Sequence, residues 1–151
     1  MNKKMLIIKG PGSAGKSTTV KLAFEAFLQF LVRTEDGADV QYLYFTKREV
    51  GAVIKVGKLR VGVATRGDSE SHVKQGLSLF AAQKCHPVVC ATRSRGKPLQ
   101  VAQNFSLRNL KVPAEEWKKP IHTGAKIQQA ENQNFAKKIA GWLRAASYGN
   151  I

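Results

Sequence analysis

The stretch that decides the fold spans residues 10–17 and reads Gly10-Pro11-Gly12-Ser13-Ala14-Gly15-Lys16-Ser17. The apolar run directly before it, residues 5–8, has the composition of a buried parallel strand. After it, apolar residues recur at helical spacing, namely Val20, Phe24, Phe27, Leu28 and Leu31. A strand, a glycine-rich turn and a helix therefore follow one another, which predicts an α/β fold whose first strand ends at this turn.

The residue types in this turn favour binding of a phosphate chain. Glycine has no side chain, so a turn with Gly10, Gly12 and Gly15 can direct its backbone N–H groups inward around a phosphate. The first turn of the following helix adds unpaired N–H groups and the positive end of the helix dipole. Lys16 would reach the β- and γ-phosphates, and Ser17 would offer its hydroxyl to Mg²⁺. The alternative is a turn that binds no ligand, and the agreement of strand, turn and helix argues against it.

With these residues the chain resembles the P-loop (Walker A) NTPases, and among them the small kinase-like ATP-binding proteins. The resemblance implies that residues 10–18 bind ATP together with Mg²⁺. It implies that Pro11, Ser13 and Ala14 are part of this loop and that Thr18 faces the α-phosphate. It covers the first 35 residues by motif and the remainder by the order of elements.

The rest of the chain alternates predicted strands with predicted helices. Strands are predicted over residues 41–46, 50–56, 59–65 and 86–92, with Gly57 and Lys58 joining the middle two in a hairpin. One helix begins near residues 66–70, and its inward face is Val73, Leu77 and Phe80. A second helix begins at Pro98, and its inward residues are Leu99, Ala102, Phe105 and Leu107. The last helix spans residues 123–146 and buries Phe135, Ile139, Trp142 and Leu143. Residues 33–39 and 111–123 are expected to be irregular. The pattern predicts one domain over residues 1–151, a three-layer sandwich with a mostly parallel sheet and one antiparallel hairpin.

A P-loop enzyme also needs an acidic residue near the loop to hold Mg²⁺, and no predicted strand ends directly in Asp or Glu. Asp68, three residues beyond Thr65, is the candidate for this role. Glu70 is a candidate base or water-orienting group. A second interpretation stays open, in which Asp68 caps the helix that follows, and the two roles do not exclude each other.

A basic cluster, Arg93, Arg95 and Lys97, follows the predicted strand 86–92. The carboxyl ends of parallel strands meet at one edge of a sheet, so we expect the cluster beside the phosphate loop. There it could clamp a phosphate in the transition state, as the basic lid of small kinases does, and a solvated loop is the alternative. Arg66 occupies a similar position after another strand. Arg95 stands where GTPases carry the aspartate that reads guanine, which argues against guanine specificity.

Charge is the second signal. The chain has 25 Lys and Arg against 10 Asp and Glu, a formal net charge of +15 at pH 7. From Gly76 onward it has 12 basic and 3 acidic residues. This balance favours an anionic partner beyond a nucleotide, with nucleic acid first, while solubility combined with a phosphate substrate is the alternative.

The cysteines and the N-terminus indicate the compartment. Cys85 and Cys90 do not make a disulfide framework, and their spacing around His86 matches no zinc pattern. The apolar run 5–8 is too short for a signal peptide, and no stretch is apolar enough to span a bilayer. We therefore expect a cytoplasmic protein with reduced thiols and no membrane partner.

Two classes of function remain open. The first is an enzyme that hydrolyses ATP or transfers its phosphoryl group with Mg²⁺, with Lys16, Asp68, Arg93 and Arg95 as catalytic residues and Ser17 and Asp68 at the metal. The second is a nucleotide-gated module that binds nucleic acid or protein with little turnover. The intact Lys16-Ser17 pair favours the enzyme, which is the interpretation we prefer. The module is favoured by the position of Asp68, which does not directly follow a strand, and by the large positive net charge of the chain.

Overall fold

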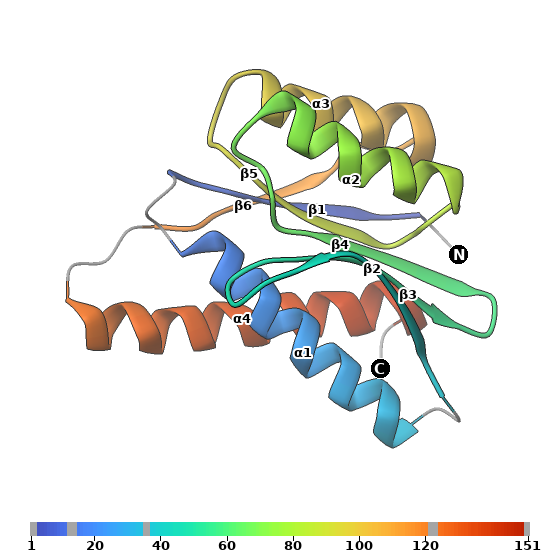
Figure 1. Cartoon of the computed structure of the whole chain (residues 1–151), viewed down its shortest axis with the longest axis horizontal. Helices are drawn as coiled ribbons and strands as arrows, with labels where there is room; N and C mark the ends of the chain where they lie inside the picture. Colours follow the sequence, from blue (N-terminus) through green and yellow to red (C-terminus); the bar gives the residue numbers. More distant parts are fainter. Residues whose placement is uncertain (1–2, 12–14, 35–36, 121–123, 150–151) are drawn as a thin grey trace.

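The computed structural model describes residues 3–11, 15–34, 37–120 and 124–149. Within them, strands and helices alternate along the chain (Figure 1). The strands are β1 (Met5–Lys9), β2 (Asp39–Phe45), β3 (Val50–Val56), β4 (Leu59–Ala64), β5 (Val88–Thr92) and β6 (Glu115–Lys118). The helices are α1 (Lys16–Thr34), α2 (Glu70–Ala82), α3 (Lys97–Phe105) and α4 (Ala125–Tyr148), and α3 continues as a π-helical turn, Ser106–Leu110. None of these helices is both long and apolar enough to cross a lipid bilayer.

The strands form one six-stranded sheet in the order β2-β3-β4-β5-β1-β6. β4, β5, β1 and β6 are parallel neighbours, while β3 runs antiparallel to both β2 and β4. β1 lies inside the sheet, where Ile7 is opposite Cys90 of β5 and Glu116 of β6. The turn that follows β1 therefore opens at the carboxyl edge of the parallel strands, where ligands bind in open α/β sheets.

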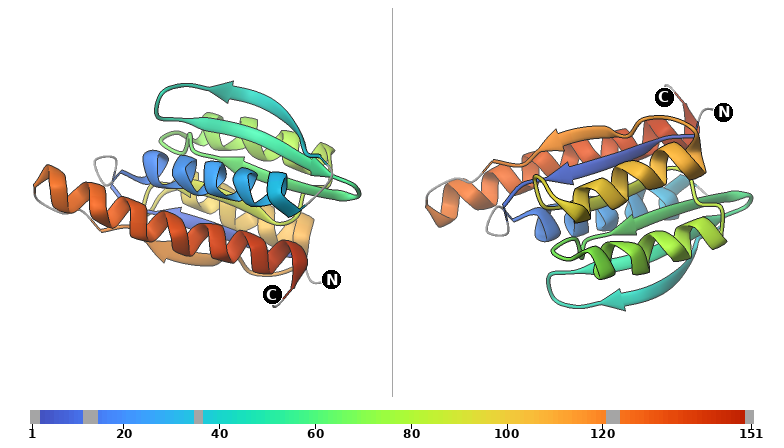
Figure 2. Two further views of the ribbon diagram at one scale, coloured as in Figure 1. Left: turned by 90° about the horizontal axis from the view of Figure 1, so that it is seen from below. Right: turned by 90° about the horizontal axis from the view of Figure 1, so that it is seen from above.

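Helices cover both faces of the sheet and complete three layers (Figure 2). α1 and α4 pack on one face with Leu6 and Ile8 of β1, and α2 and α3 pack on the other face with Met5 and Ile7. Because both faces of β1 are buried, its sequence is a continuous apolar run and does not alternate. The predicted α/β class, with a mostly parallel sheet and the β3–β4 hairpin, is confirmed.

Most of the predicted elements are present with small shifts at their ends. The β3–β4 turn is Gly57 and Lys58, and Gly57 has a φ of +56°, a value that a glycine adopts without strain. The predicted inward positions of α2 and α3 are buried, namely Val73, Leu77, Phe80, Leu99, Ala102 and Phe105. In α4, Ile139 and Leu143 are buried as expected, whereas Phe135 and Trp142 are only partly buried against the core.

Two predictions were wrong. Residues 115–118, expected to be irregular, form the edge strand β6, because β1 supplies their hydrogen-bond partners although the segment is mostly polar. The ring of Trp117 in β6 meets Phe135 of α4 edge-on, with ring centroids 6.2 Å apart. Leu107 is 52% exposed, because the chain changes from α-helix to a π-helical turn at Ser106 and the inward face moves.

Candidate functional site

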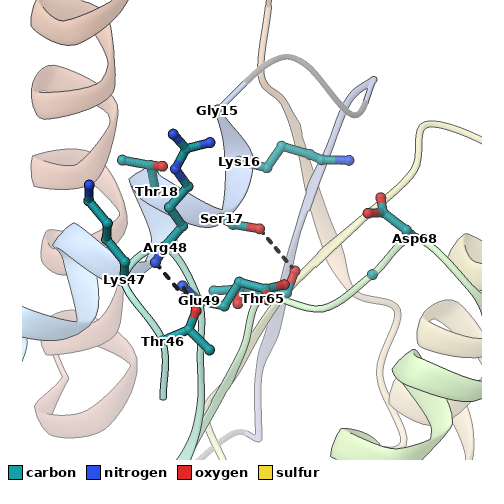
Figure 3. A pocket seen from close by; sticks show the side chains of 11 residues that line it. Gly15, Lys16, Ser17, Thr18, Thr46, Lys47, Arg48, Glu49, Thr65 and Asp68 are labelled. Atoms are coloured by element: carbon teal, nitrogen blue, oxygen red, sulfur yellow. Dashed lines mark hydrogen bonds between the residues drawn. The ribbon is translucent and has the colours of Figure 1, made fainter. Parts of the chain in front are cut away.

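A cavity of about 570 Å³ opens at the carboxyl edge of the sheet, beside the start of α1 (Figure 3). Residues 15–18 form one wall, and the turn between β2 and β3, residues 46–49, forms another. Thr65, Gly67 and Asp68, which follow β4, complete the lining. The antiparallel direction of β3 explains why these three segments lie together, since β3 begins at the edge of the sheet where β4 ends and α1 starts.

The predicted phosphate loop is described at its two ends, while Gly12, Ser13 and Ala14 lie outside the described residues. Gly10, buried at the end of β1, donates its N–H to the carbonyl of Thr92, 3.3 Å away. Pro11 is exposed. Gly15 has a φ of +76°, and an added Cβ would come within 3.0 Å of the Asn132 amide in α4. The backbone conformation therefore favours glycine there, and the first turns of α4 belong to the surroundings of the loop.

Lys16 is buried, with 6% of its surface exposed. Its Nζ donates to the carbonyl oxygens of Gly10, at 2.5 Å, and Thr92, at 2.9 Å. Burial lowers the pKa of this ammonium; Asp68 raises it in part, and Arg93 lowers it further. Among the described residues, no carboxylate lies within 4 Å of Lys16 Nζ. A buried cation without a carboxylate partner is stabilised by an anion placed beside it.

Ser17 lies on the cavity wall, where its Oγ donates to the carbonyl of Thr65 at 3.4 Å (Figure 3). Thr65 is itself fixed, because its Oγ1 accepts the N–H of Val50 at 3.0 Å and its own N–H donates to the carbonyl of Val50 at 3.0 Å. The hydroxyl of Ser17 is therefore held against a rigid part of the sheet edge. Its role as a Mg²⁺ ligand stays a prediction.

Asp68 does not cap α2, so that interpretation was wrong. The cap is Ser69, whose Oγ accepts the N–H of His72 at 3.2 Å. Ser69 directly precedes the first helical residue, Glu70, and Asp68 lies one residue too early for capping. The Asp68 carboxylate is exposed at the cavity, and its Oδ1 lies 3.8 Å from Nε of Arg93. Asp68 is thus free of a capping role, and its metal role stays a prediction.

Gly67 sets the position of Asp68, a role that sequence reasoning missed. A Cβ added at Gly67 would meet the carbonyl oxygen of Ala91 and would lie 2.6 Å from the Ala91 carbonyl carbon and 2.7 Å from the Cα of Thr92. The segment after β4 therefore rests directly on the backbone at the end of β5. The one signal in the sequence was a glycine placed shortly after a strand and next to the candidate acid.

Arg66 connects two walls of the cavity. Its Nε lies 3.2 Å from Oε1 of Glu49 in the β2–β3 turn, and its guanidinium lies 4.1 Å from the centre of the Tyr44 ring. The phenolic oxygen of Tyr44 accepts the N–H groups of Thr65, at 3.0 Å, and Arg66, at 2.8 Å. Burial raises the pKa of Tyr44, so the phenol stays neutral at physiological pH. Arg66 therefore has a structural task at the site.

The predicted arginine cluster lies beside the cavity and does not line it. Arg93 is exposed and reaches Asp68, whereas Arg95 is exposed in the turn before α3. Glu70, the candidate base, is paired with Lys74 at 2.8 Å. The fold thus brings Arg93 to the candidate acid, and the catalytic roles of Arg93 and Arg95 stay predictions.

A divalent metal would depend on few protein ligands. In the part of the chain that the structure describes, no three His, Cys, Asp or Glu side chains are grouped so that they could hold a metal ion. Mg²⁺ commonly binds through one or two protein oxygens together with substrate phosphates and waters. The hydroxyl of Ser17 and the carboxylate of Asp68, both at the cavity, fit that pattern.

Comparisons with protein-family models, curated proteins and solved structures find no match for this chain.

Proposed function

We propose that the chain is a P-loop protein that binds ATP with Mg²⁺ and hydrolyses it or transfers its phosphoryl group. The observation that carries the proposal is the ammonium of Lys16, buried at the start of α1 and bonded to the carbonyls of Gly10 and Thr92. The positive end of a 19-residue helix lies at the same point. Two positive groups beside a cavity of about 570 Å³ favour an anion there, and a phosphate chain fits in a cavity of this size.

Each wall has a separate task in this proposal. Lys16 balances the charge that develops on the phosphate oxygens, and Thr18 donates its hydroxyl to the phosphate nearest the ribose. Ser17 and Asp68 would hold Mg²⁺, which neutralises the phosphate charge when it is bound. Asp68 also lies where a carboxylate can orient the attacking hydroxyl or water, and Arg93 Nε lies 3.8 Å from its Oδ1.

A nucleotide-gated module is the second candidate, and one observation favours it. A second cavity, of about 330 Å³, is lined in part by Lys3, Lys84 and His86 at the opposite edge of the sheet. Arg60 pairs through its backbone with His86 at this edge. Burial lowers the pKa of the His86 imidazole, so the cations here are Lys3, Lys84 and Arg60. Such a concentration of cations, away from the first cavity, would suit a polyanion such as nucleic acid.

Two measurements test the candidates: the binding and reaction of ATP, and nucleic-acid binding with and without ATP at several salt concentrations. ATP affinity, phosphate release and transfer of the γ-phosphate are measured for the wild type, Lys16→Ala and Asp68→Ala, with Lys58→Ala as a control for loss of charge. We expect Lys16→Ala to weaken ATP binding about 10- to 100-fold, the size of a charged hydrogen bond, and Asp68→Ala to lose turnover while keeping much of the affinity. If the wild type binds ATP no more tightly than Lys16→Ala does, the proposal is overturned. Binding without turnover, together with salt-sensitive nucleic-acid binding that ATP changes, would favour the module.

A further inference from the structure

We propose that Lys47 and Arg48, in the turn between β2 and β3, form a second half of the phosphate site and bind the phosphate chain from the side opposite α1. This inference rests on the proposed function and assigns it two residues outside the glycine-rich motif. The turn lines the same cavity as the start of α1. What it binds is one of the two phosphates that nucleoside diphosphates and triphosphates share.

Hydrogen bonds close the turn and connect it to α1. Thr46 Oγ1 accepts the N–H groups of Arg48, at 3.4 Å, and Glu49, at 3.0 Å. The N–H of Thr46 donates to the carbonyl of Glu49 at 2.9 Å. Lys21 of α1 donates its Nζ to the carbonyls of Thr46, at 2.7 Å, and Lys47, at 2.9 Å. The turn is therefore fastened to the helix whose N-terminus forms the other half of the site.

The charges of the turn are left uncompensated. Glu49 is the one carboxylate between residues 46 and 49, and it pairs with Arg66 at 3.2 Å. Over residues 3–11, 15–34, 37–120 and 124–149, neither Lys47 nor Arg48 has a carboxylate within 4 Å. Both side chains are exposed. The turn thus presents two free cations to the cavity.

The direction of Arg48 indicates what these cations bind. Figure 3 shows its guanidinium pointing toward Thr18 and Gly15 at the start of α1, on the side of Ser17 away from Asp68. Cations that face the positive end of a helix repel it, and an anion between them removes the repulsion and is attracted to both walls. A guanidinium matches a phosphate through paired N–H groups, and Lys47 adds a point charge. Because Thr18 is the residue proposed for the α-phosphate, Arg48 is expected to contact that phosphate.

Titration calorimetry of ATP and of ADP, each with Mg²⁺, tests this assignment. The variants are Arg48→Ala, Arg48→Lys and the double variant Lys47→Ala/Arg48→Ala, with Lys58→Ala as the matched control. We expect Arg48→Ala to weaken ATP and ADP equally, about tenfold, and Arg48→Lys to keep part of the affinity. The double variant should weaken both nucleotides further, and Lys58→Ala should leave both unchanged. All these side chains are exposed, so the thermal unfolding of every variant should match that of the wild type.

The outcomes separate this inference from the proposed function. Wild-type affinity in the double variant, with loss of ATP binding in Lys16→Ala, overturns the inference and leaves the proposed function standing. Loss of ATP affinity with ADP unchanged places Arg48 at the γ-phosphate and overturns the assignment to a phosphate that both nucleotides share. A wild type that binds neither nucleotide overturns the proposed function itself.

Discussion

Replacing Gly67 by alanine should detach the segment that carries Asp68 from the end of β5. The new Cβ would lie 2.6 Å from the carbonyl carbon of Ala91 and 2.7 Å from the Cα of Thr92. Carbon atoms in contact stand about 3.5–4.0 Å apart, so the segment must move by about 1 Å. These neighbours are backbone atoms inside the sheet, which cannot rotate away as a flexible side chain would.

The cost of Gly67→Ala has two parts. Forcing an extra methyl group into a packed region costs about 1–3 kcal/mol. The movement also stretches the hydrogen bonds that the N–H groups of Thr65 and Arg66 donate to Tyr44, at 3.0 and 2.8 Å, and each is worth about 1 kcal/mol. We therefore expect a loss of about 2–4 kcal/mol in the free energy of unfolding. For a chain of this length that is roughly 4–16 °C in melting temperature.

Urea unfolding and calorimetric melting measure this loss, with Gly141→Ala as the matched control. A Cβ at Gly141, in α4, would have no atom within 4 Å, so this change should stabilise the protein by about 0.5–1 kcal/mol through helix propensity. Gly67→Ala should in addition lower turnover, because Asp68 moves with the segment. A Gly67→Ala protein that melts with the wild type would refute the proposed close packing of this segment on β5.

Two further predictions follow from the pKa shifts. Burial lowers the pKa of Lys16 below its ordinary value of 10.5, and a bound phosphate favours the charged form. At a pH above the lowered pKa, nucleotide binding should therefore take up a proton, and affinity should fall as pH rises through that range. Calorimetry at such a pH in buffers of different ionisation enthalpy measures the uptake, and binding without it would contradict the prediction. Burial raises the pKa of Cys85 to about 11 and of Cys90 to about 12. At pH 8 about one Cys85 thiol in a thousand is ionised. Both thiols should therefore react with a thiol reagent only in denaturant. Rapid labelling of the native protein would show that they are not buried as described.

The sequence by itself determined the strand β1, the turn after it and α1. These elements are contiguous, and their signals are local: a continuous apolar run, glycines at fixed offsets and a helical period of apolar residues. The same kind of signal placed the inward faces of α2 and α3. It also placed Lys16 at the helix start, because one residue's position in a turn depends on its immediate neighbours.

The predicted hairpin also implied a position for residues 46–49 that the sequence analysis did not state. A hairpin of β3 and β4 puts the beginning of β3 at the edge where β4 ends, so the preceding turn, residues 46–49, must lie at the site. The cap of α2 was misplaced by one residue, since Asp68 and Ser69 are both good capping residues. The hydrogen bond that the backbone N–H of His72 donates to the side-chain Oγ of Ser69 decides between them.

Only the tertiary structure decided the remaining parts of the site. The carbonyl of Ala91 leaves no space for a side chain at Gly67, and the hydroxyl of Tyr44 accepts the N–H groups of Thr65 and Arg66. Neither contact leaves a pattern in the local sequence. The strand β6 is a similar case, since Glu115 pairs with Leu6 at the other end of the chain. Local patterns report which face of an element is apolar. They do not report which distant backbone supplies a hydrogen bond or approaches within contact distance. In this protein such approaches position Thr65, Gly67 and Asp68, the wall of the cavity that follows β4.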